Sequence, residues 1–346
     1  MTRSRFIGLA GLLVACNAAA AATAPPDTSH FTVVRRIPIG EEGGWDYVTA
    51  DPAGHRLFVS HGTHVVVVDT RTDSVAGEIP NTPGVHGIAL APDAGRGFTS
   101  NGRDSSVTVF DLKTLATLSN VKVPASNPDA IAYDAASGRV FTFNGRSANA
   151  TALDARTGAI VGSVALGGKP EFAATDGAGK LFVNLEDSSA VVELDTRNLK
   201  VLARWPIAPG EEPSGLALDR AHHRLFSGCG NQKLVVLDSQ SGKVVTTLPI
   251  GQGVDAVAYD ATRGLVFASN GDGTLTVIRE ESPDRYRVVE NVLTERGART
   301  MALDESTGTI YLPTADFGPP PEPTADRPHP RPSIVPGTFR LLVVRR

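Results

Sequence analysis

The sequence predicts an all-β protein, namely a seven-bladed β-propeller with four-stranded antiparallel blades. The first observation is a unit that recurs seven times, with starts 40 to 44 residues apart. The second is that the units hold short strand-like runs separated by turn residues. The third is that the last unit lacks one strand, which a segment near the N-terminus can supply. Repeats of this length with four strands are typical of propeller blades. The units start at Asp46, His86, Asp129, Glu171, Ser214, Asp255 and Arg299.

The clearest unit spans residues 129–170 and predicts four strands. Apolar, β-branched or aromatic residues fill 130–133, 140–143, 150–153 and 160–166. Turns that contain aspartate, asparagine or glycine separate these runs. Four strands cannot bury both faces of their sheet alone, so we expect neighbouring units of the same kind to pack against them.

The two ends of the chain are predicted to close the ring. The seventh unit supplies strands at 300–303, 310–312 and 339–344, and the sequence then stops at Arg346. Residues 31–40, FTVVRRIPIG, have the form of a fourth strand from inside the array. We therefore expect the N-terminal strand to complete the last blade, which leaves no open sheet edge.

The first 24 residues predict an export signal. Arg3 and Arg5 precede an uncharged run at 6–15. That run is too short to cross a bilayer, because a spanning helix needs about 20 apolar residues. This pattern predicts an exported protein of the periplasm or cell envelope.

Two ways of processing this signal are open. Residues 13–16, Leu-Val-Ala-Cys, resemble the bacterial lipobox, which would make Cys16 the lipidated first residue and the point of membrane attachment. Ordinary cleavage within 18–24 is the alternative. Residues 25–29 then form a tether, and residues 30–346 form a single propeller domain.

Charge and cysteine content narrow the function classes. The formal net charge is −4, and removing residues 1–15 makes it −6. A mildly acidic chain lacks the overall field that attracts nucleic acid, so a nucleic-acid partner is not expected on charge. Cys229 is the only cysteine besides Cys16, and no intramolecular disulfide is expected once Cys16 is lipidated or removed.

No well-marked enzyme class is supported by sequence motifs. The chain contains no CxxC, P-loop, HExxH, GxSxG or glycine-rich dinucleotide fingerprint. We therefore predict no organic cofactor, and a divalent metal is the one candidate.

Recurring aspartates are predicted to shape turns rather than to catalyse. An aspartate that opens a turn accepts hydrogen bonds from backbone N–H groups a few residues further on. The structural interpretation is therefore favoured for these residues, which are Asp51, Asp93, Asp134, Asp176, Asp219, Asp260 and Asp304 between the first and second strands, and Asp69, Asp111, Asp154, Asp195 and Asp238 between the third and fourth.

A motif recurs from blade to blade. It consists of Leu-Phe in the second strand, an asparagine after it, an apolar third strand that ends in aspartate, and Thr-Gly before the fourth. This motif resembles the YVTN-repeat β-propeller family, in its exported YncE-like branch, from about residue 30 to residue 346. The resemblance implies a seven-bladed propeller of the bacterial envelope. It also implies a DNA-binding alternative, because some YncE-like proteins are reported to bind DNA.

One connection departs from the repeat. In blades one to six, the second and third strands are joined by tight hairpins, whereas in blade seven residues 314–338 form a proline-rich insertion. Prolines hold a chain extended without internal hydrogen bonds. Long loops inside compact domains are uncommon and often functional, so a docking arm and a passive insertion both remain open.

The seven unit starts are expected to form a ring where the first strands enter the central channel. Six of the seven can carry charge, with Ser214 the exception. We expect an acidic mouth with one basic sector near Arg299, and this mouth is the candidate site for a cationic or zwitterionic ligand, a peptide or a metal ion. The alternative is a solvated rim without a ligand. Further charged residues of the neighbouring loops are Glu41, Glu42, Glu211, Glu212 and Arg296.

Three histidines are expected on the same face. His61 and His64 bracket the hairpin of blade one, and His86 begins blade two. Imidazoles beside carboxylates suit zinc or copper, so these residues are a candidate metal site. Exposed loop histidines without a ligand are the alternative.

The sequence favours a monomeric binding or scaffold module whose partner is a small molecule or a protein. A periplasmic enzyme, such as a lyase or lactonase-like hydrolase, is the alternative from another class. It would use His86 or His61 as general base and Arg299 to stabilise charge. The DNA-binding hypothesis is the third.

Overall fold

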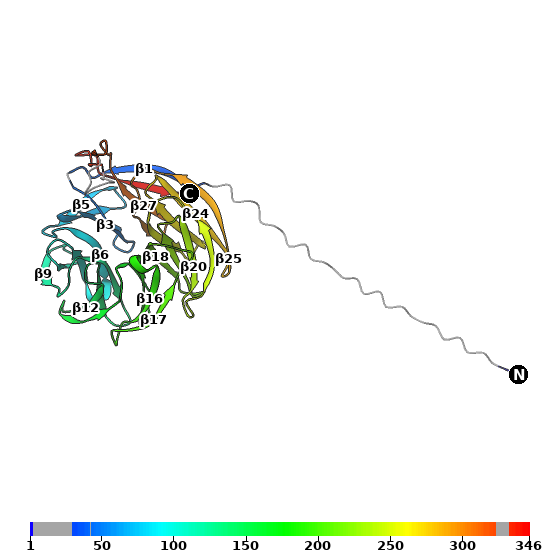
Figure 1. The fold of residues 1–346 in the computed structure, drawn as a ribbon. Coiled ribbons are helices and arrows are strands. Elements are labelled where there is room, and N and C mark those ends of the chain that lie inside the picture. The colour runs from blue at the N-terminus through cyan, green and yellow to red at the C-terminus, as the bar shows by residue number, and fades with distance from the viewer. Residues whose placement is uncertain (3–29, 42, 323–331) are drawn as a thin grey trace. The chain divides into compact units, whose positions relative to one another are not determined.

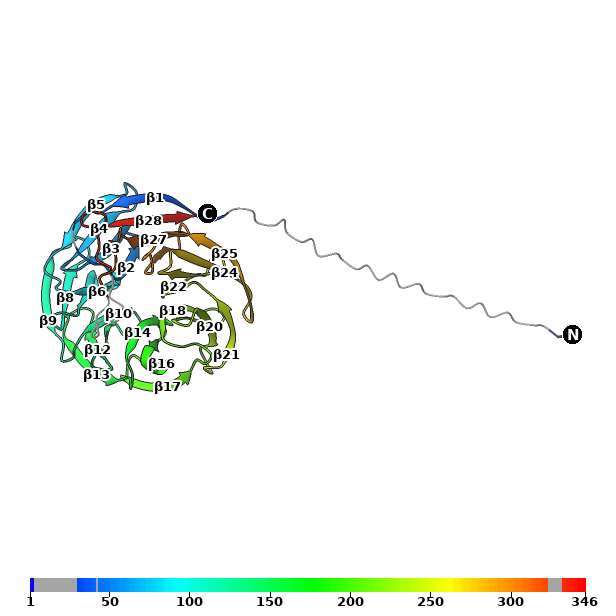
Figure 2. The same cartoon turned by 45° about the horizontal axis from the view of Figure 1, so that its top comes forward.

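The computed structural model describes residues 1–2, 30–41, 43–322 and 332–346, and the chain from Phe31 onward forms one compact unit. Seven four-stranded sheets make up this unit, and every paired strand runs antiparallel to its neighbour. Figures 1 and 2 show the sheets arranged as blades around a central axis. The predicted seven-bladed β-propeller is confirmed.

The first and second strands of each blade lie nearest the axis (Figure 2). The first strands are β2 (Val48–Asp51), β6 (Val85–Ala91), β10 (Pro128–Asp134), β14 (Pro170–Thr175), β18 (Pro213–Asp219), β22 (Val254–Asp260) and β26 (Ala302–Asp304). The second strands are β3 (Arg56–His61), β7 (Arg96–Asn101), β11 (Arg139–Asn144), β15 (Lys180–Leu185), β19 (Arg224–Cys229), β23 (Leu265–Asn270) and β27 (Thr309–Thr314).

The third and fourth strands follow outward. The third strands are β4 (His64–Asp69), β8 (Ser106–Asp111), β12 (Asn149–Asp154), β16 (Ala190–Asp195), β20 (Lys233–Asp238), β24 (Thr274–Ser282) and β28 (Arg340–Arg345). The fourth strands are β5 (Ser74–Ile79), β9 (Thr117–Lys122), β13 (Ile160–Ala165), β17 (Lys200–Pro206), β21 (Val244–Pro249), β25 (Arg285–Leu293) and β1 (Thr32–Pro38). Two short 3-10 turns, Pro92–Ala94 and Glu186–Ser188, lie in loops.

The N-terminal strand closes the ring as predicted. β1 pairs antiparallel with β28, from Thr32 opposite Arg345 to Pro38 opposite Arg340. The side chain of Ile37 is buried between blades seven and one, while Val34 on the same strand is 53% exposed. Backbone pairing and apolar burial therefore act together at the seam.

The core is spread around the ring because each blade covers its neighbour. The third strands are mostly apolar and their central residues are buried, and β4 is apolar throughout from Val65 to Val68. Phe58 of blade one and Phe110 of blade two meet with ring centroids 5.8 Å apart. Sheets covered on both faces need such continuous runs rather than alternating ones.

The turn aspartates have the predicted structural role in the outer turns. Asp154 accepts hydrogen bonds from the backbone N–H groups of Arg156 at 3.0 Å and Thr157 at 2.8 Å. The amide of Thr157 and its hydroxyl lower the pKa of the Asp154 carboxyl. Equivalent backbone bonds end at Asp69, Asp111, Asp195 and Asp238.

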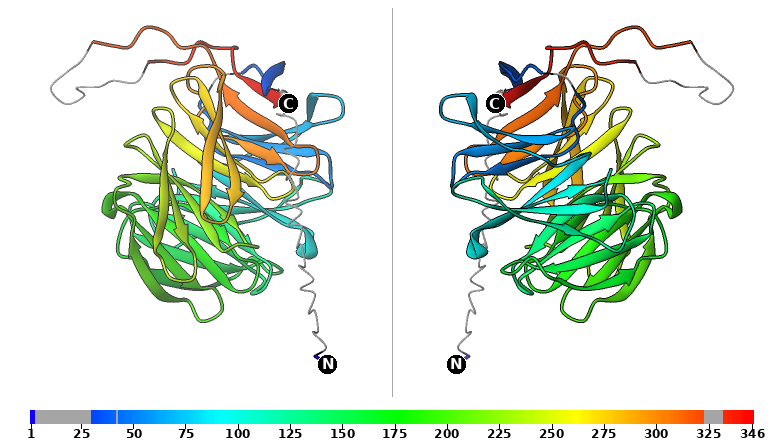
Figure 3. Two further views of the ribbon diagram at one scale, coloured as in Figure 1. Left: turned by 90° about the vertical axis from the view of Figure 1, so that its right-hand side faces the viewer. Right: turned by 90° about the vertical axis from the view of Figure 1, so that its left-hand side faces the viewer.

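The proline-rich insertion begins after β27, and its central residues 323–331 lie outside the described part of the chain. Its two described arms pair through Phe317 and Ile334, and the amide of Gly318 donates to the Ser333 carbonyl at 2.8 Å. Arg340 holds this base through Asp316 at 2.7 Å. Figure 3 shows the described arms, coloured orange to red, projecting from the ring beside blade seven.

Of the two cysteines, the structure describes only Cys229. Cys229 is fully buried among apolar residues, and burial raises the pKa of its thiol to about 11. The candidate lipidation residue Cys16, like the export signal around it, lies outside the described residues. Among the residues that the structure describes, no helix is long and apolar enough to cross a membrane.

The seam makes a stability prediction. Ile37→Ala should lower the free energy of unfolding by about 2–5 kcal/mol, because it opens a cavity in the closing blade. Val34→Ala, on the exposed face of the same strand, should change it by less than about 0.5 kcal/mol. Denaturant unfolding of both variants measures the difference, and equal losses would contradict a closure that depends on apolar burial.

Candidate functional site

The predicted ring residues project from irregular points of the first strands. In five blades the strand pairing skips at the ring position, so an extra residue stands out of the ladder as a β-bulge. In β10, for example, Pro128 pairs with Asn144 and Ile131 with Thr142, which leaves Asp129 and Ala130 opposite a single residue. Asp46 and Arg299 lie just before β2 and β26. In those five blades, the bulge allows the side chain of the ring residue to face the channel instead of packing inside the blade.

Hydrogen bonds between blades hold the ring in place. Ser100 of blade two donates to the backbone carbonyl of Asp129 in blade three. The amide of Asn184 in blade four reaches the Ser214 carbonyl of blade five at 2.9 Å. Ser269 of blade six donates to the Arg299 carbonyl of blade seven. A polar residue in a second strand thus fixes the backbone of the next blade where the bulge interrupts the ladder.

All seven ring residues line one cavity of about 340 Å³. That volume suits a small molecule or a peptide end. Six carboxylates face three basic side chains across the lining, so the cavity carries an excess of negative charge. The carboxylates are Asp46, Asp129, Glu171, Glu186, Glu212 and Asp255, and the basic residues are His86, Lys169 and Arg299.

An aromatic pair spans the channel beneath this ring. Tyr47 of blade one and Phe172 of blade four stack with centroids 4.4 Å apart and an interplanar angle of 29°. Each of these aromatic residues directly follows one of the seven ring residues in the chain, Asp46 or Glu171. Phe172 also packs against the cores of blades five to seven, and Tyr47 against those of blades three and four. Tyr47 lines the cavity and is backed by Phe172, so we call this pair the aromatic floor and the cavity the cup.

The floor carries a polar atom that the described residues do not satisfy. The Tyr47 hydroxyl is buried and has no hydrogen-bond partner among them. Burial raises the pKa of Tyr47 well above its usual range, and the charges of Asp129 and Asp46 raise it further. A buried hydroxyl without a partner costs stability and is an anchor for a ligand.

Ion pairs join neighbouring positions of the ring. His86 Nδ1 lies 2.6 Å from Asp46 Oδ2 and 3.6 Å from Asp129 Oδ1. Arg299 Nε lies 3.2 Å from Asp255. Burial lowers the pKa of His86, but the hydrogen bond to Asp46 and the charge of Asp129 outweigh it, so the pKa is raised. The ion pairs with Asp46 and Asp129 therefore favour the protonated form of His86.

Lys169 forms ion pairs with two further carboxylates of the cup. Its ammonium lies 2.8 Å from Glu171 and also pairs with Glu186. Burial nevertheless raises the pKa of Glu171, because the hydrogen bond from Lys169 does not offset desolvation and the nearby charge of Asp129.

Asp129 is a strongly perturbed aspartate of the cup. Burial raises its pKa to about 6. The positive charges of His86 and Lys169 lower this pKa, whereas the negative charges of Asp46 and Asp255 raise it. Its side chain is only 17% exposed. Like charges gathered in a buried cup account for the direction of this shift.

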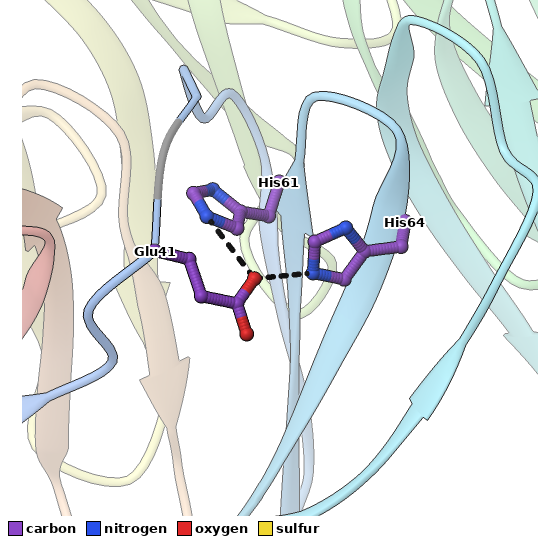
Figure 4. A group of neighbouring side chains, drawn as sticks. All are labelled: Glu41, His61 and His64. Atoms are coloured by element: carbon purple, nitrogen blue, oxygen red, sulfur yellow. Dashed lines mark ion pairs between the residues drawn. The ribbon is translucent and has the colours of Figure 1, made fainter. Parts of the chain in front are cut away.

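The three histidines do not form one cluster. His61 and His64 lie together with Glu41, whereas His86 belongs to the cup with Asp46 and Asp129 (Figure 4 shows the first group). A shared face therefore does not place all three at a common point. Burial lowers the pKa of His61, and the neighbouring His64 lowers it further.

A second hollow adjoins the cup and shares Arg299 with it. This groove of about 370 Å³ is lined by aromatic and aliphatic side chains of the ring seam and of the insertion. Trp45 stacks on Phe339 at 5.0 Å and meets Phe317 at 6.1 Å. Phe317 also lies directly against the backbone of Gly297, which has a φ of +81° and no room for a side chain. The insertion thus forms one wall beside the cup.

Sequence reasoning found the ring but missed part of the cup. Tyr47, Lys169 and Glu186 line it and were not singled out. Lys169 and Glu186 could have been found, since they lie in loops of the same predicted face as the ring. Tyr47 and Phe172 carry no motif, and their contact depends on the width of the channel.

Comparisons with known proteins show the fold. No protein-family model and no curated protein matches the chain. A solved structure described as the crystal structure of a mitotic checkpoint complex matches with a TM-score of 0.74 at 14% identity, covering 97% of this chain and 99% of the other. The structure of U3-55K matches with a TM-score of 0.72 at 8% identity, covering 89% and 97%. At such identities, the similarity is one of fold alone.

The raised pKa of Asp129 predicts a pH-dependent stability difference. The Asp129 carboxyl has a pKa of about 6 in the folded protein, against 3.8 ordinarily. It therefore does not lower the free energy of unfolding below about pH 4, and it lowers this free energy by the full amount above about pH 6. Asp129→Asn should therefore be more stable than wild type at pH 8 by roughly 3 kcal/mol and nearly equal to it at pH 4.

Denaturant unfolding at the two pH values measures this difference. Glu78→Gln, which removes an exposed carboxylate of the outer strand β5, is the matched control and should show no pH-dependent gain. A wild type as stable as Asp129→Asn at pH 8 would show that the ring imposes no electrostatic cost.

Proposed function

We propose that this propeller is a binding module that holds an organic cation, such as the ammonium group of a small molecule or peptide, in its acidic cup. The observation that carries the proposal is the gathering of buried carboxylates with raised pKa values over an aromatic floor. Like charges in a buried site cost free energy unless a ligand balances them.

The cup offers three kinds of contact to a cation. Asp129 and Glu171 lose repulsion when a positive charge enters, and their carboxylates accept charged hydrogen bonds. The Tyr47 hydroxyl can accept the hydrogen bond that it lacks. The ring of Tyr47, which lines the cup, attracts a cation to its face. An organic ammonium uses all three, which favours it over a bare ion.

The groove beside Arg299 extends the proposal to the rest of the ligand. A ligand whose ammonium enters the cup can place an apolar group against Trp45, Phe317 and Ile334. Arg299 stands between the two hollows and can pair with a carboxylate. These features suit a zwitterion, or a peptide or protein segment that the insertion helps to hold. A similar propeller belongs to a mitotic checkpoint complex, which supports protein binding for the fold in general.

The place of action is part of the same proposal. We propose an exported, monomeric, YncE-like protein of the periplasm or cell envelope, either free or anchored through Cys16. The support is the basic and then apolar N-terminus, the lipobox-like residues 13–16 and the repeated blade motif.

Catalysis and DNA binding fit the cup less well. A general base must accept a proton, and the pairing of His86 with Asp46, which raises the pKa of His86, favours the imidazolium form that cannot accept one. His61, whose pKa is lowered, belongs to the other histidine group and not to the cup of Arg299. The carboxylate excess repels phosphates, which nucleic-acid sites must attract.

Cation binding should depend on pH. Calorimetric titration with spermidine, choline and lysine-containing dipeptides at pH 8 should find a cation that binds. At pH 5 the same cation should bind at least about tenfold more weakly, since protonation of two carboxylates removes more than ~1.4 kcal/mol of attraction.

Variants separate the cup from the rest of the surface. Asp129→Asn with Glu171→Gln should weaken binding at pH 8 as low pH does, while Glu78→Gln should leave it unchanged. Two results would overturn the proposal. One is an affinity that changes neither with pH nor in the double variant, and the other is no binding by any cation of the panel.

A further inference from the structure

A second group of polar side chains lies at the seam, apart from the cup. His61 ends β3 and His64 begins β4, and the two are direct cross-strand partners in the hairpin of blade one. Their rings meet edge to face with centroids 5.1 Å apart. Glu41 comes from the loop between β1 and β2 and reaches over the hairpin, as Figure 4 shows.

The nitrogen atoms of both rings converge on this carboxylate. His64 Nε2 lies 2.9 Å and His61 Nε2 3.7 Å from Glu41 Oε2. One donor atom from each of the three residues lies within 4.8 Å of the other two. That spacing is close to what a single bound ion requires, and only small side-chain movements separate it from metal–ligand distances.

Three of the histidine ring nitrogens are buried and make no regular hydrogen bond. The His61 side chain is fully buried, and neither of its ring nitrogens has a side-chain hydrogen-bond partner among the described residues; its nearest polar neighbours are the backbone of Gly44 and the Glu41 carboxylate. His64 Nε2 is also buried, and its one close polar neighbour among the described residues is the Glu41 carboxylate at 2.9 Å. Buried polar atoms of this kind need a partner, and a metal ion would provide one.

The surroundings fix the orientation of the first ring. Phe339 of the closing blade stacks on His61 with centroids 4.7 Å apart and planes 13° from parallel. Gly43 lies near the Cε1 edge of the same imidazole. A ligand held on rigid strands by packing is pre-organised for binding.

We propose that Glu41, His61 and His64 bind one divalent transition-metal ion, with zinc as the best-fitting ion. Two imidazoles and one carboxylate are donors that zinc uses with a fourth position left for water. Magnesium and calcium prefer oxygen ligands throughout, so they fit poorly. This site goes beyond the proposed cation cup and does not include His86.

The position of the ion gives it a mechanical consequence. Glu41 follows β1, which belongs to blade seven, whereas His61 and His64 belong to blade one. An ion that joins them therefore cross-links the two blades where the ring closes. Zinc should raise the melting temperature of the whole propeller, because it binds the folded form only.

The test is a calorimetric titration of the full-length protein, made without a histidine tag and stripped with a chelator. Zinc should bind at one ion per chain and magnesium should not. His64→Ala should weaken zinc binding by at least about tenfold, since losing even an outer-shell partner costs ~10–100-fold. Cobalt should give a visible absorption band that His64→Ala abolishes.

Two control variants locate the ion. His222→Ala removes the histidine from another histidine and carboxylate group, with Asp219 and Glu280, and should leave binding unchanged. Asp129→Asn should also leave it unchanged, because the cup is a separate site. Glu41→Gln, on a side chain that is 53% exposed, is a second ligand variant if His64→Ala fails to fold.

Three results would overturn the proposal. They are no zinc binding by the wild type, zinc binding by His64→Ala and Glu41→Gln as tight as that of the wild type, or loss of binding in His222→Ala or Asp129→Asn. The last result would place the ion elsewhere.

Discussion

The pairing of β1 with β28 is the constraint on which the rest of the structure depends. A blade without its fourth strand would leave an open edge, and the first strands would not be held in a closed circle. Closure brings residues from Asp46 to Arg299, far apart in the chain, to one cavity. It also sets the channel width at which Tyr47 and Phe172 meet across the axis. The site is therefore a property of the whole ring.

The site is built where the regular structure is interrupted. Bulges in the first strands release residues such as Asp129 from the ladder, and serine and asparagine side chains of neighbouring blades replace the lost bonds. The backbone is thus satisfied while the side chains face the channel. The cost is electrostatic rather than steric, because buried carboxylates of like charge stand close together. A cost of that kind is what a positively charged ligand removes.

The repeat made the fold and the ring predictable, but contacts across the ring were beyond the sequence. Spacing alone indicated that Glu171 and Asp255 share a mouth, because equivalent positions of successive blades must face one axis. Phe172 could not be assigned to a floor, since its partner is three blades away. The expectation that His86 lies beside His61 was wrong, because residues on one face of the propeller can belong to separate side-chain groups. The position of the Glu41 side chain depends on the path of the irregular loop between β1 and β2, which the sequence repeat does not predict.

The most direct test of the account is the titration of the Asp129 carboxyl carbon by NMR in the ligand-free, full-length protein. The account predicts a midpoint near pH 6, because burial and neighbouring carboxylates resist ionisation. Addition of a bound cation should move that midpoint down. A midpoint near the ordinary value of about 3.9, with no response to cations, would contradict the claim that the cup is built for positive charge.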